Sequence, residues 1–253
     1  MKAEERLTQL HPSPVLFGMP HPSLVLARAA VREIPDTDWP RVLEAAVDAG
    51  ALHAAEAELA TTLAPGRRAT FVAGREALRS ALRQLPNAAS GVPETPILRT
   101  PRGAPLLPSG VTGSVTHKST LALATVAPRV ASLQHVGLDL ERRPTGNELA
   151  RPSIARKILT AREFATLDQC RDELAAREHT LVHFAIKEAV YKAIDPFVER
   201  YVRFTEVELA LRTDGEAEVT LHLPELHDGE LRVQAHWQLE DDWIIAQAFS
   251  YRG

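Results

Sequence analysis

Hydrophobic positions recur with two periods along the chain, and the switch between these periods separates predicted helices from predicted strands. Helical spacing covers residues 38–49, 51–63, 67–85, 152–159, 160–167 and 184–194. Alternating or continuous apolar runs cover residues 23–31, 110–118, 121–127, 136–141, 206–211, 216–223, 230–239 and 243–250. The last four runs are separated by turn-forming residues, so the pattern predicts an α+β protein that ends in an antiparallel meander.

Two segments carry no such period. Residues 1–22 are rich in proline and predict an extended lead-in. Residues 86–110 combine proline and glycine over a length that is typical of functional or disordered loops.

The helix predicted around residues 184–194 places charges among apolar residues. No glycine or proline interrupts it before Pro196. Glu188 and Lys192 are four residues apart and project from one side of a helix, and Lys187 lies beside them. A carboxylate between two ammonium groups suits a site for phosphate and metal. The alternative is a partly exposed helix with an ordinary ion pair.

A second charged pattern lies on the strand predicted at residues 136–141. Alternation sends Leu138 and Leu140 to one face and Asp139 and Glu141 to the other. The two carboxylates either face solvent or share a cation. Oxygen ligands without cysteine or an adjacent histidine favour Mg²⁺ or Ca²⁺ over zinc.

Arginines form a stripe on the helix predicted at residues 67–85. Arg68, Arg75, Arg79 and Arg83 follow spacings of seven, four and four residues. Such a stripe either holds phosphate or forms a solvated face. The preceding helix carries His53, Glu56 and Glu58, which we expect on a solvated face.

Another candidate for anion contact is His117, which lies at the end of a predicted strand beside Thr116 and Lys118. The alternative is that His117 is a structural histidine whose ring is hydrogen-bonded within the protein.

Composition narrows the class of protein and the compartment. The net charge of −4 argues against a dedicated nucleic-acid binder. A single cysteine, Cys170, excludes an intramolecular disulfide framework and is typical of a reducing cytoplasm. We expect no signal peptide, because the N-terminus is charged, and no membrane span, because no apolar run reaches the required length. We therefore expect a cytoplasmic protein without a membrane partner.

Combined, these segments resemble the signature of 4′-phosphopantetheinyl transferases of the Sfp and EntD type. The resemblance covers roughly residues 68–193 and keeps the family's order and spacing. One departure is Phe184, where several relatives have tryptophan. The motifs that carry the resemblance are Gly74-Arg75-Glu76-Ala77-Leu78-Arg79, Arg102-x-x-Pro105, Gly113-Ser114-Val115-Thr116-His117, Gly137-x-Asp139-x-Glu141 and Phe184-x-x-Lys187-Glu188-x-x-x-Lys192.

The resemblance implies a fold and an activity. The fold is two similar α/β lobes, residues 1–130 and 131–253, each a small mainly antiparallel sheet packed by helices, with the active site in the cleft between the lobes. The lobe boundary is expected near Pro128 to Ser132. The activity is transfer of the phosphopantetheine arm of coenzyme A to a serine of an acyl- or peptidyl-carrier protein, with release of adenosine 3′,5′-bisphosphate. This branch of the family implies a monomer.

The resemblance also implies roles for individual residues. Three carboxylates resemble the ligands of Mg²⁺, or of Mn²⁺ in its place: Asp139, Glu141 and Glu188. The implied coenzyme A contacts are Arg68, Arg75, Arg102, Thr116, His117, Lys187 and Lys192. The two lysines resemble pyrophosphate contacts, and His117 with Thr116 resembles the contact to the nucleotide 3′-phosphate. Glu188, Lys192 and Asp139 are the implied catalytic residues, and either Glu188 or a metal-held water takes the serine proton.

Some questions stay open at the level of sequence. The segment after the signature helix offers Phe197, Val198, Tyr201 and Val202 either as a docking rim for the carrier protein or as plain packing. A Mg²⁺-dependent coenzyme A or pyrophosphate hydrolase would use the same carboxylates, and a non-catalytic anion-binding module would use the arginine stripe. The pathway served, whether fatty-acid, polyketide or nonribosomal peptide synthesis, is not encoded in these motifs.

Overall fold

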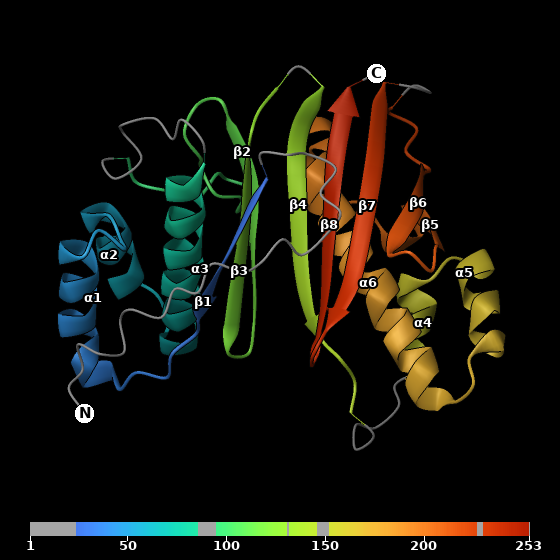
Figure 1. Ribbon diagram of the computed structural model, residues 1–253, viewed down its shortest axis with the longest axis horizontal. Helices are drawn as coiled ribbons and strands as arrows, with labels where there is room; N and C mark the ends of the chain where they lie inside the picture. Colours follow the sequence, from blue (N-terminus) through green and yellow to red (C-terminus); the bar gives the residue numbers. More distant parts are fainter. Residues whose placement is uncertain (1–23, 86–94, 131, 146–151, 227–229, 253) are drawn as a thin grey trace. The chain divides into compact units, whose positions relative to one another are not determined.

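The computed structural model describes residues 24–85, 95–130, 132–145, 152–226 and 230–252 (Figure 1). The chain divides into two compact units, Met1–Pro128 and Arg129–Gly253. The predicted lead-in and residues 86–94 of the predicted loop lie outside the described residues.

Unit 1 is a three-stranded antiparallel sheet packed by helices. Its strands are β1 (Val25–Ala30), β2 (Val111–Lys118) and β3 (Leu121–Pro128), in the order β1-β3-β2. Its helices are α1 (Trp39–Asp48), α2 (Ala54–Thr61) and α3 (Pro65–Gln84), with a 3-10 turn, η2, at Asp36–Asp38. The central strand β3 is buried from Ala122 to Ala127, as its continuous apolar run predicts.

Helix α3 is covered on two sides, which a simple amphipathic pattern does not predict. One side packs on the sheet of unit 1 through small and aliphatic residues, among them Ala77, Leu78 and Ala81. Phe71 and Val72 belong instead to a second cluster that α1 and α2 share. Figure 1 shows α3 lying along the sheet with α1 and α2 beyond it. Arg75 and Arg79 of α3 belong to neither apolar cluster and are nevertheless buried.

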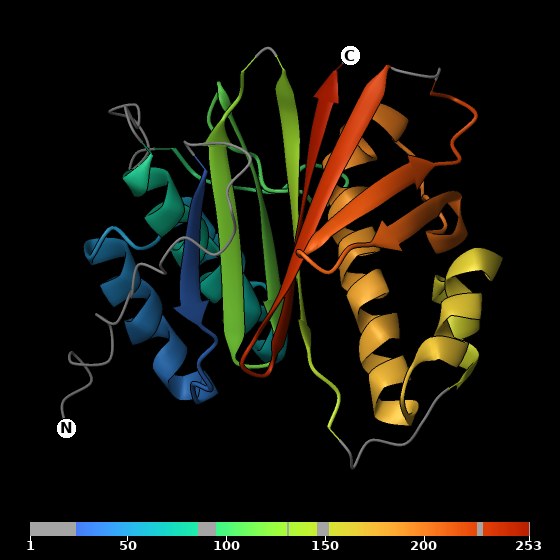
Figure 2. The same cartoon turned by 45° about the vertical axis from the view of Figure 1, so that its right-hand side comes forward.

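Unit 2 is a five-stranded antiparallel sheet with one long helix across it. The strands are β4 (Leu133–Arg142), β5 (Val207–Leu211), β6 (Glu216–Leu221), β7 (Leu231–Glu240) and β8 (Trp243–Arg252), in the order β4-β8-β7-β6-β5. The predicted meander is confirmed, with β4 added beside β8 (Figure 2). The helices are α4 (Pro152–Ile158), α5 (Ala161–Ala165) and α6 (Glu173–Val198), with 3-10 turns η3 (Thr166–Gln169) and η4 (Phe204–Glu206).

Glycine at position 137 lets α6 lie directly on β4. A Cβ atom at Gly137 would stand 1.8 Å from the carbonyl oxygen of Ala189. Ala189 and Ala193 are themselves fully buried small residues on the contacting side of α6. This close approach fixes the part of α6 that carries Glu188 and Lys192 against the strand that carries Asp139 and Glu141.

The expected α+β class is confirmed by two small antiparallel sheets, each packed by helices. In the parts of the chain that the structure describes, none of the helices has the length and apolar character needed to cross a lipid bilayer.

Candidate active site

Asp139 and Glu141 are buried carboxylates on β4. Their exposed fractions are 6% and 8%, although Leu138 and Leu140 on the opposite face are also buried. The strand is thus covered on both faces here, and the solvent-facing interpretation of the two carboxylates is wrong. Two carboxylates buried side by side on one strand face need a compensating positive charge.

Helix α6 brings that positive charge and a third carboxylate. The Nζ atom of Lys192 donates to Asp139 Oδ1 at 2.7 Å and to the carbonyl oxygen of Leu138 at 2.8 Å. Burial raises the pKa of Glu188 above its ordinary value, and the nearby Asp139 and Glu141 carboxylates raise it further, while the Lys192 ammonium group lowers it in part. Three carboxylates and one lysine therefore act on one another within unit 2.

This group of side chains attracts a cation but does not enclose one. Among the described residues, no three Asp, Glu, His or Cys side chains are arranged to hold a metal ion by themselves. Mg²⁺ commonly binds proteins through one or two carboxylates and keeps several waters. The oxygen-only donor set of Asp139, Glu141 and Glu188 fits that behaviour, because three carboxylates outweigh a single ammonium group.

Lys187 does not face this group of carboxylates. Its side chain is only 1% exposed, and Nζ donates to Glu163 Oε2 at 2.6 Å and to the carbonyl oxygens of Ile158 and Phe204. Consecutive helical residues point about 100° apart, so Lys187 and Glu188 project in different directions. The expected contact of Lys187 with pyrophosphate has no support in this arrangement, and we leave it out of the proposed site.

Two of the predicted anion contacts in unit 1 also bind the protein's own backbone. Arg68 donates from Nε to the carbonyl oxygen of Ala60 and from a terminal nitrogen to that of Leu63, both at 3.0 Å. Arg75 is buried and donates from Nε to the carbonyl oxygen of Ile97 at 2.6 Å. Burial lowers the pKa of Arg75 to about 10, although nearby Glu56 raises it. The guanidinium groups of Arg68 and Arg75 bind backbone carbonyl oxygens of neighbouring segments, so neither arginine is among the proposed contacts to coenzyme A.

The remaining predicted residues of unit 1 lie on β2 and on a turn. Thr116 is buried on β2, and His117 beside it is half-buried. Arg102 lies in an exposed turn, which a bridge between Arg99 and Pro105 closes. These positions remain compatible with the expected phosphate contacts.

Sequence reasoning missed two buried carboxylates. Glu56, expected on a solvated face, is fully buried and binds the guanidinium group of Arg79 at 2.8 Å. Glu163 forms a capping box with Thr160 at the start of α5 and also binds Lys187. Both glutamates follow a helix N-cap by three residues, and this spacing is the only sequence signal that marks them.

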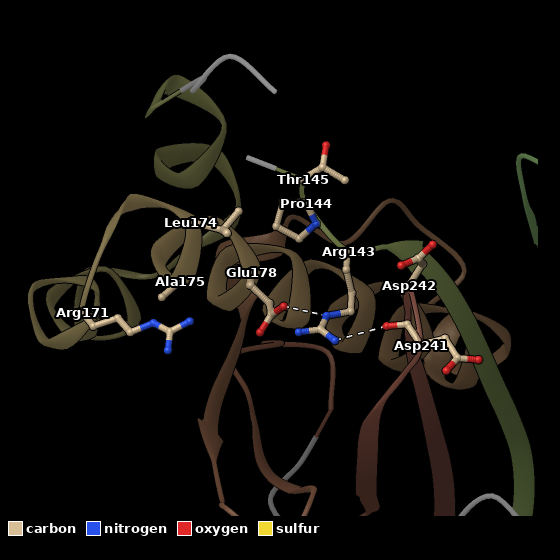
Figure 3. Close-up of a pocket in the computed structure, with 9 residues that line it drawn as sticks. All are labelled: Arg143, Pro144, Thr145, Arg171, Leu174, Ala175, Glu178, Asp241 and Asp242. Atoms are coloured by element: carbon tan, nitrogen blue, oxygen red, sulfur yellow. Dashed lines mark hydrogen bonds and ion pairs between the residues drawn. The ribbon is translucent and has the colours of Figure 1, made fainter. Parts of the chain in front are cut away.

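A separate pocket of about 200 Å³ lies in unit 2 (Figure 3). Arg143 crosses it and donates to Glu178 Oε2 at 2.8 Å and to the carbonyl oxygen of Asp241 at 3.2 Å. Its described lining residues include none of the predicted site residues. The pocket is therefore a polar hollow beyond the end of β4 rather than part of the carboxylate group.

Comparison with known proteins now identifies the class. Residues 55–127 match the family model of the 4′-phosphopantetheinyl transferase N-terminal domain, and residues 135–248 match that of the 4′-phosphopantetheinyl transferase superfamily. The chain belongs to the 4′-phosphopantetheinyl transferase superfamily.

Individual relatives agree with this assignment. The 4′-phosphopantetheinyl transferase Npt of Nocardia iowensis is 31% identical over 203 residues, which are 78% of this chain and 86% of the relative. The 4′-phosphopantetheinyl transferase PptT of Mycobacterium tuberculosis is 33% identical over 63% of this chain, and Svp of Streptomyces mobaraensis is 34% identical over 60%. The matches span 65% and 57% of the length of these two relatives, less than two thirds of each.

Among solved structures, similarity extends over about half of the chain. A holo-(acyl-carrier-protein) synthase from Bacillus anthracis, in complex with CoA (3′,5′-ADP), is 18% identical with a TM-score of 0.36 and is matched over 49% of this chain and 100% of its own. The holo-ACP synthase from Plasmodium yoelii is 17% identical with a TM-score of 0.34, over 49% of this chain and 97% of its own.

Proposed function

We propose that this protein transfers the 4′-phosphopantetheine arm of coenzyme A to a serine hydroxyl of an apo acyl- or peptidyl-carrier domain and releases adenosine 3′,5′-bisphosphate. The observation that carries the proposal is the convergence of Asp139, Glu141, Glu188 and Lys192 in unit 2 of a chain that belongs to this superfamily. A serine oxygen bonds to the phosphorus that carries pantetheine, and the bridging bond from this phosphorus to the nucleotide's 5′-phosphate oxygen breaks.

In this proposal the three carboxylates hold Mg²⁺, with Mn²⁺ as an alternative. When bound, the ion would neutralise charge on the pyrophosphate. Burial raises the pKa of Glu188 most, and the Asp139 and Glu141 carboxylates raise it further; a bound cation would offset both effects, which supports the assignment. Water and phosphate oxygens would complete the shell, since these side chains do not enclose an ion alone.

Lys192 is the proposed contact to the pyrophosphate from α6. Its bonds to Asp139 and to the Leu138 carbonyl oxygen hold the ammonium group beside the carboxylates. From there it would donate a hydrogen bond to the leaving phosphate. The serine proton would pass to Glu188 or to a water held by the metal.

Unit 1 supplies the proposed contacts to the nucleotide. Thr116 and His117 on β2, with Arg102 on the exposed turn, would bind the 3′-phosphate.

Docking of the carrier protein is proposed at Tyr201, which is 68% exposed after the end of α6. Val202, by contrast, belongs to the core of unit 2, so the packing interpretation holds for that residue. Phe197 packs edge-on against His135 and is partly covered.

The test incubates the protein with coenzyme A, Mg²⁺ and a panel of apo-carrier domains, and reads the intact mass of each carrier. The expected result is a carrier that gains one phosphopantetheine, and Glu188→Gln abolishes this gain while the variant stays folded. Release of phosphopantetheine without a modified carrier would instead identify a hydrolase. Nucleic-acid binding that weakens steeply with salt and survives Glu188→Gln would identify an anion-binding module.

A further inference from the structure

Glu163 and Lys187 form a buried ion pair that joins four segments of unit 2 to helix α6. The Nζ atom of Lys187 lies 2.6 Å from Glu163 Oε2, and both side chains are 1% exposed. Lys187 also donates to the carbonyl oxygens of Ile158, at the end of α4, and Phe204, on η4, at 2.9 and 3.0 Å. An ammonium group has three protons, so these bonds use all of them.

The carboxylate of Glu163 is equally engaged. It accepts from the backbone N–H of Thr160, the N-cap of α5, at 2.7 Å. It also accepts from the backbone N–H of Leu209 on β5 at 2.7 Å. The pair therefore ties α4, α5, η4 and β5 to one point on α6.

Unit 1 contains the same construction. Glu56 accepts from the backbone N–H of its own N-cap residue, His53, and from that of distant Ile97, and it binds Arg79 on α3. In each unit the glutamate is the third residue after an N-cap. The cation lies on the unit's longest helix, 23 residues later in unit 1 and 24 residues later in unit 2. Its occurrence in both units indicates a device for holding the long helix of each unit in place.

In unit 2 this device acts next to the proposed catalytic residues. Lys187 directly precedes Glu188, so fixing the Lys187 head group fixes the rotation of that turn of α6. On another side of the same turn, the carbonyl oxygen of Ala189 lies against Gly137. At about 100° per residue, Glu188 and Lys192 project between these two anchored sides. Rotation of α6 about its axis would move both away from Asp139.

We propose that Glu163 and Lys187 are a positioning pair, which holds α6 in the rotation that directs Glu188 and Lys192 toward β4, and that neither residue touches coenzyme A. The proposal rests on the proposed transferase function. A phosphate that reached Lys187 would have to displace acceptors in a pocket that excludes solvent, and would leave the Glu163 carboxylate buried without its cation.

The test compares Glu163→Gln, Lys187→Met and the double variant with the wild type, by steady-state transfer to an apo-carrier domain at varied coenzyme A. Lys157→Met, which removes an exposed lysine of α4, is the matched control. Misplacing a catalytic group by about 1 Å costs on the order of 100-fold, so each single variant should lose at least about tenfold in kcat. The KM for coenzyme A should stay within about twofold. The double variant should be no slower than the slower single variant, because the two residues act as one unit.

A tenfold higher KM for coenzyme A in Lys187→Met but not in Glu163→Gln would overturn the proposal and make Lys187 a substrate contact. Wild-type kcat in both single variants would also overturn it. If Lys187→Met does not fold, Lys187→Arg keeps the charge and copies the arginine of unit 1; it should bind coenzyme A normally with a reduced kcat. An inactive wild type would refute the transferase function itself, a result distinct from any of these.

Discussion

The charged form of Glu188 destabilises the folded protein, and the neighbouring side chains do not fully offset this effect. Burial and the carboxylates of Asp139 and Glu141 raise its pKa, so the charged form is less stable in the folded protein than in the unfolded chain. We expect Glu188→Gln to raise the Tm of the metal-free protein by about 1–3 °C while abolishing transfer, as at other sites that trade stability for activity. Differential scanning calorimetry without divalent ions checks the first part.

The sign of this effect fixes its pH dependence. A carboxyl group whose pKa is higher in the folded state does not destabilise the protein at a pH below its unfolded pKa of about 4.3. It destabilises the protein fully at a pH above its folded pKa. The Tm advantage of Glu188→Gln should therefore be near zero at about pH 4 and grow as pH rises through the folded pKa. Glu173→Gln, at an exposed position on α6, should show no such growth. A Glu188→Gln variant less stable than the wild type at neutral pH would contradict the cost of burying this carboxylate beside Asp139 and Glu141.

Mg²⁺ bound beside Asp139, Glu141 and Glu188 should reduce the repulsion among these carboxylates. Binding only to the folded protein stabilises it by about 2.7 kcal/mol at 100 times the Kd. We expect MgCl₂ to raise the Tm of the wild type and to raise that of Glu188→Gln and Asp139→Asn less. NaCl at equal ionic strength separates site binding from screening. Equal shifts in all three proteins would argue against a site formed by these carboxylates.

Gly137 sets the contact of β4 with α6 at a single residue. Because its Cβ would lie 1.8 Å from a backbone oxygen, Gly137→Ala must push the helix away from the strand. Overpacking of this kind costs roughly 1–3 kcal/mol or more, so the urea midpoint should fall clearly. Gly66→Ala on α3, where a Cβ meets nothing within 4 Å, is the matched control and should be neutral or stabilising. Equal midpoints for Gly137→Ala and wild type would show that the contact is not tight.

At the scale of elements, hydrophobic period predicted the helices and strands but not the partners of their charged residues. The helix over 67–85 follows from local spacing, which is why the sequence identifies it. Glu56 and Lys187 were misplaced because their partners include backbone groups such as Ile97 N–H and the Phe204 carbonyl oxygen. Backbone groups carry no residue-specific signature.

The same reasoning explains the arginine stripe on α3. Its spacing places the arginines on one side of a helix, and a stripe of charge normally faces solvent or an anion. In this protein the side is covered by α2 and by residues 95–98, whose carbonyl oxygens accept from Arg75 and Arg79. Arg75 and Arg79 are buried because residues 95–98 pass over this side of α3. No residue pattern in the sequence predicted that path of the chain.

At the scale of the whole molecule, the two buried ion pairs should affect different steps of one reaction. The pair in unit 1 anchors Ile97 and Thr95, which lead into the turn that carries Arg102. Arg102 is a proposed contact for the nucleotide, whereas Glu188 and Lys192 are proposed to act on the reacting phosphate. Loosening the first pair should weaken substrate binding, and loosening the second should weaken chemistry.

We therefore expect Glu56→Gln to raise the KM for coenzyme A by several-fold to about tenfold while keeping kcat at saturation, the reverse of the pattern for Glu163→Gln. Both changes neutralise a buried carboxylate while keeping its shape, and both leave a buried cation without its negatively charged partner. The two variants should therefore lose similar amounts of Tm. Similar instability with opposite kinetic effects would separate positioning from general loss of structure. Glu58→Gln, an exposed neighbour on α2, should change neither parameter. If Glu56→Gln and Glu163→Gln both lowered kcat and raised KM by the same factors, the two units would not divide binding and chemistry in this way.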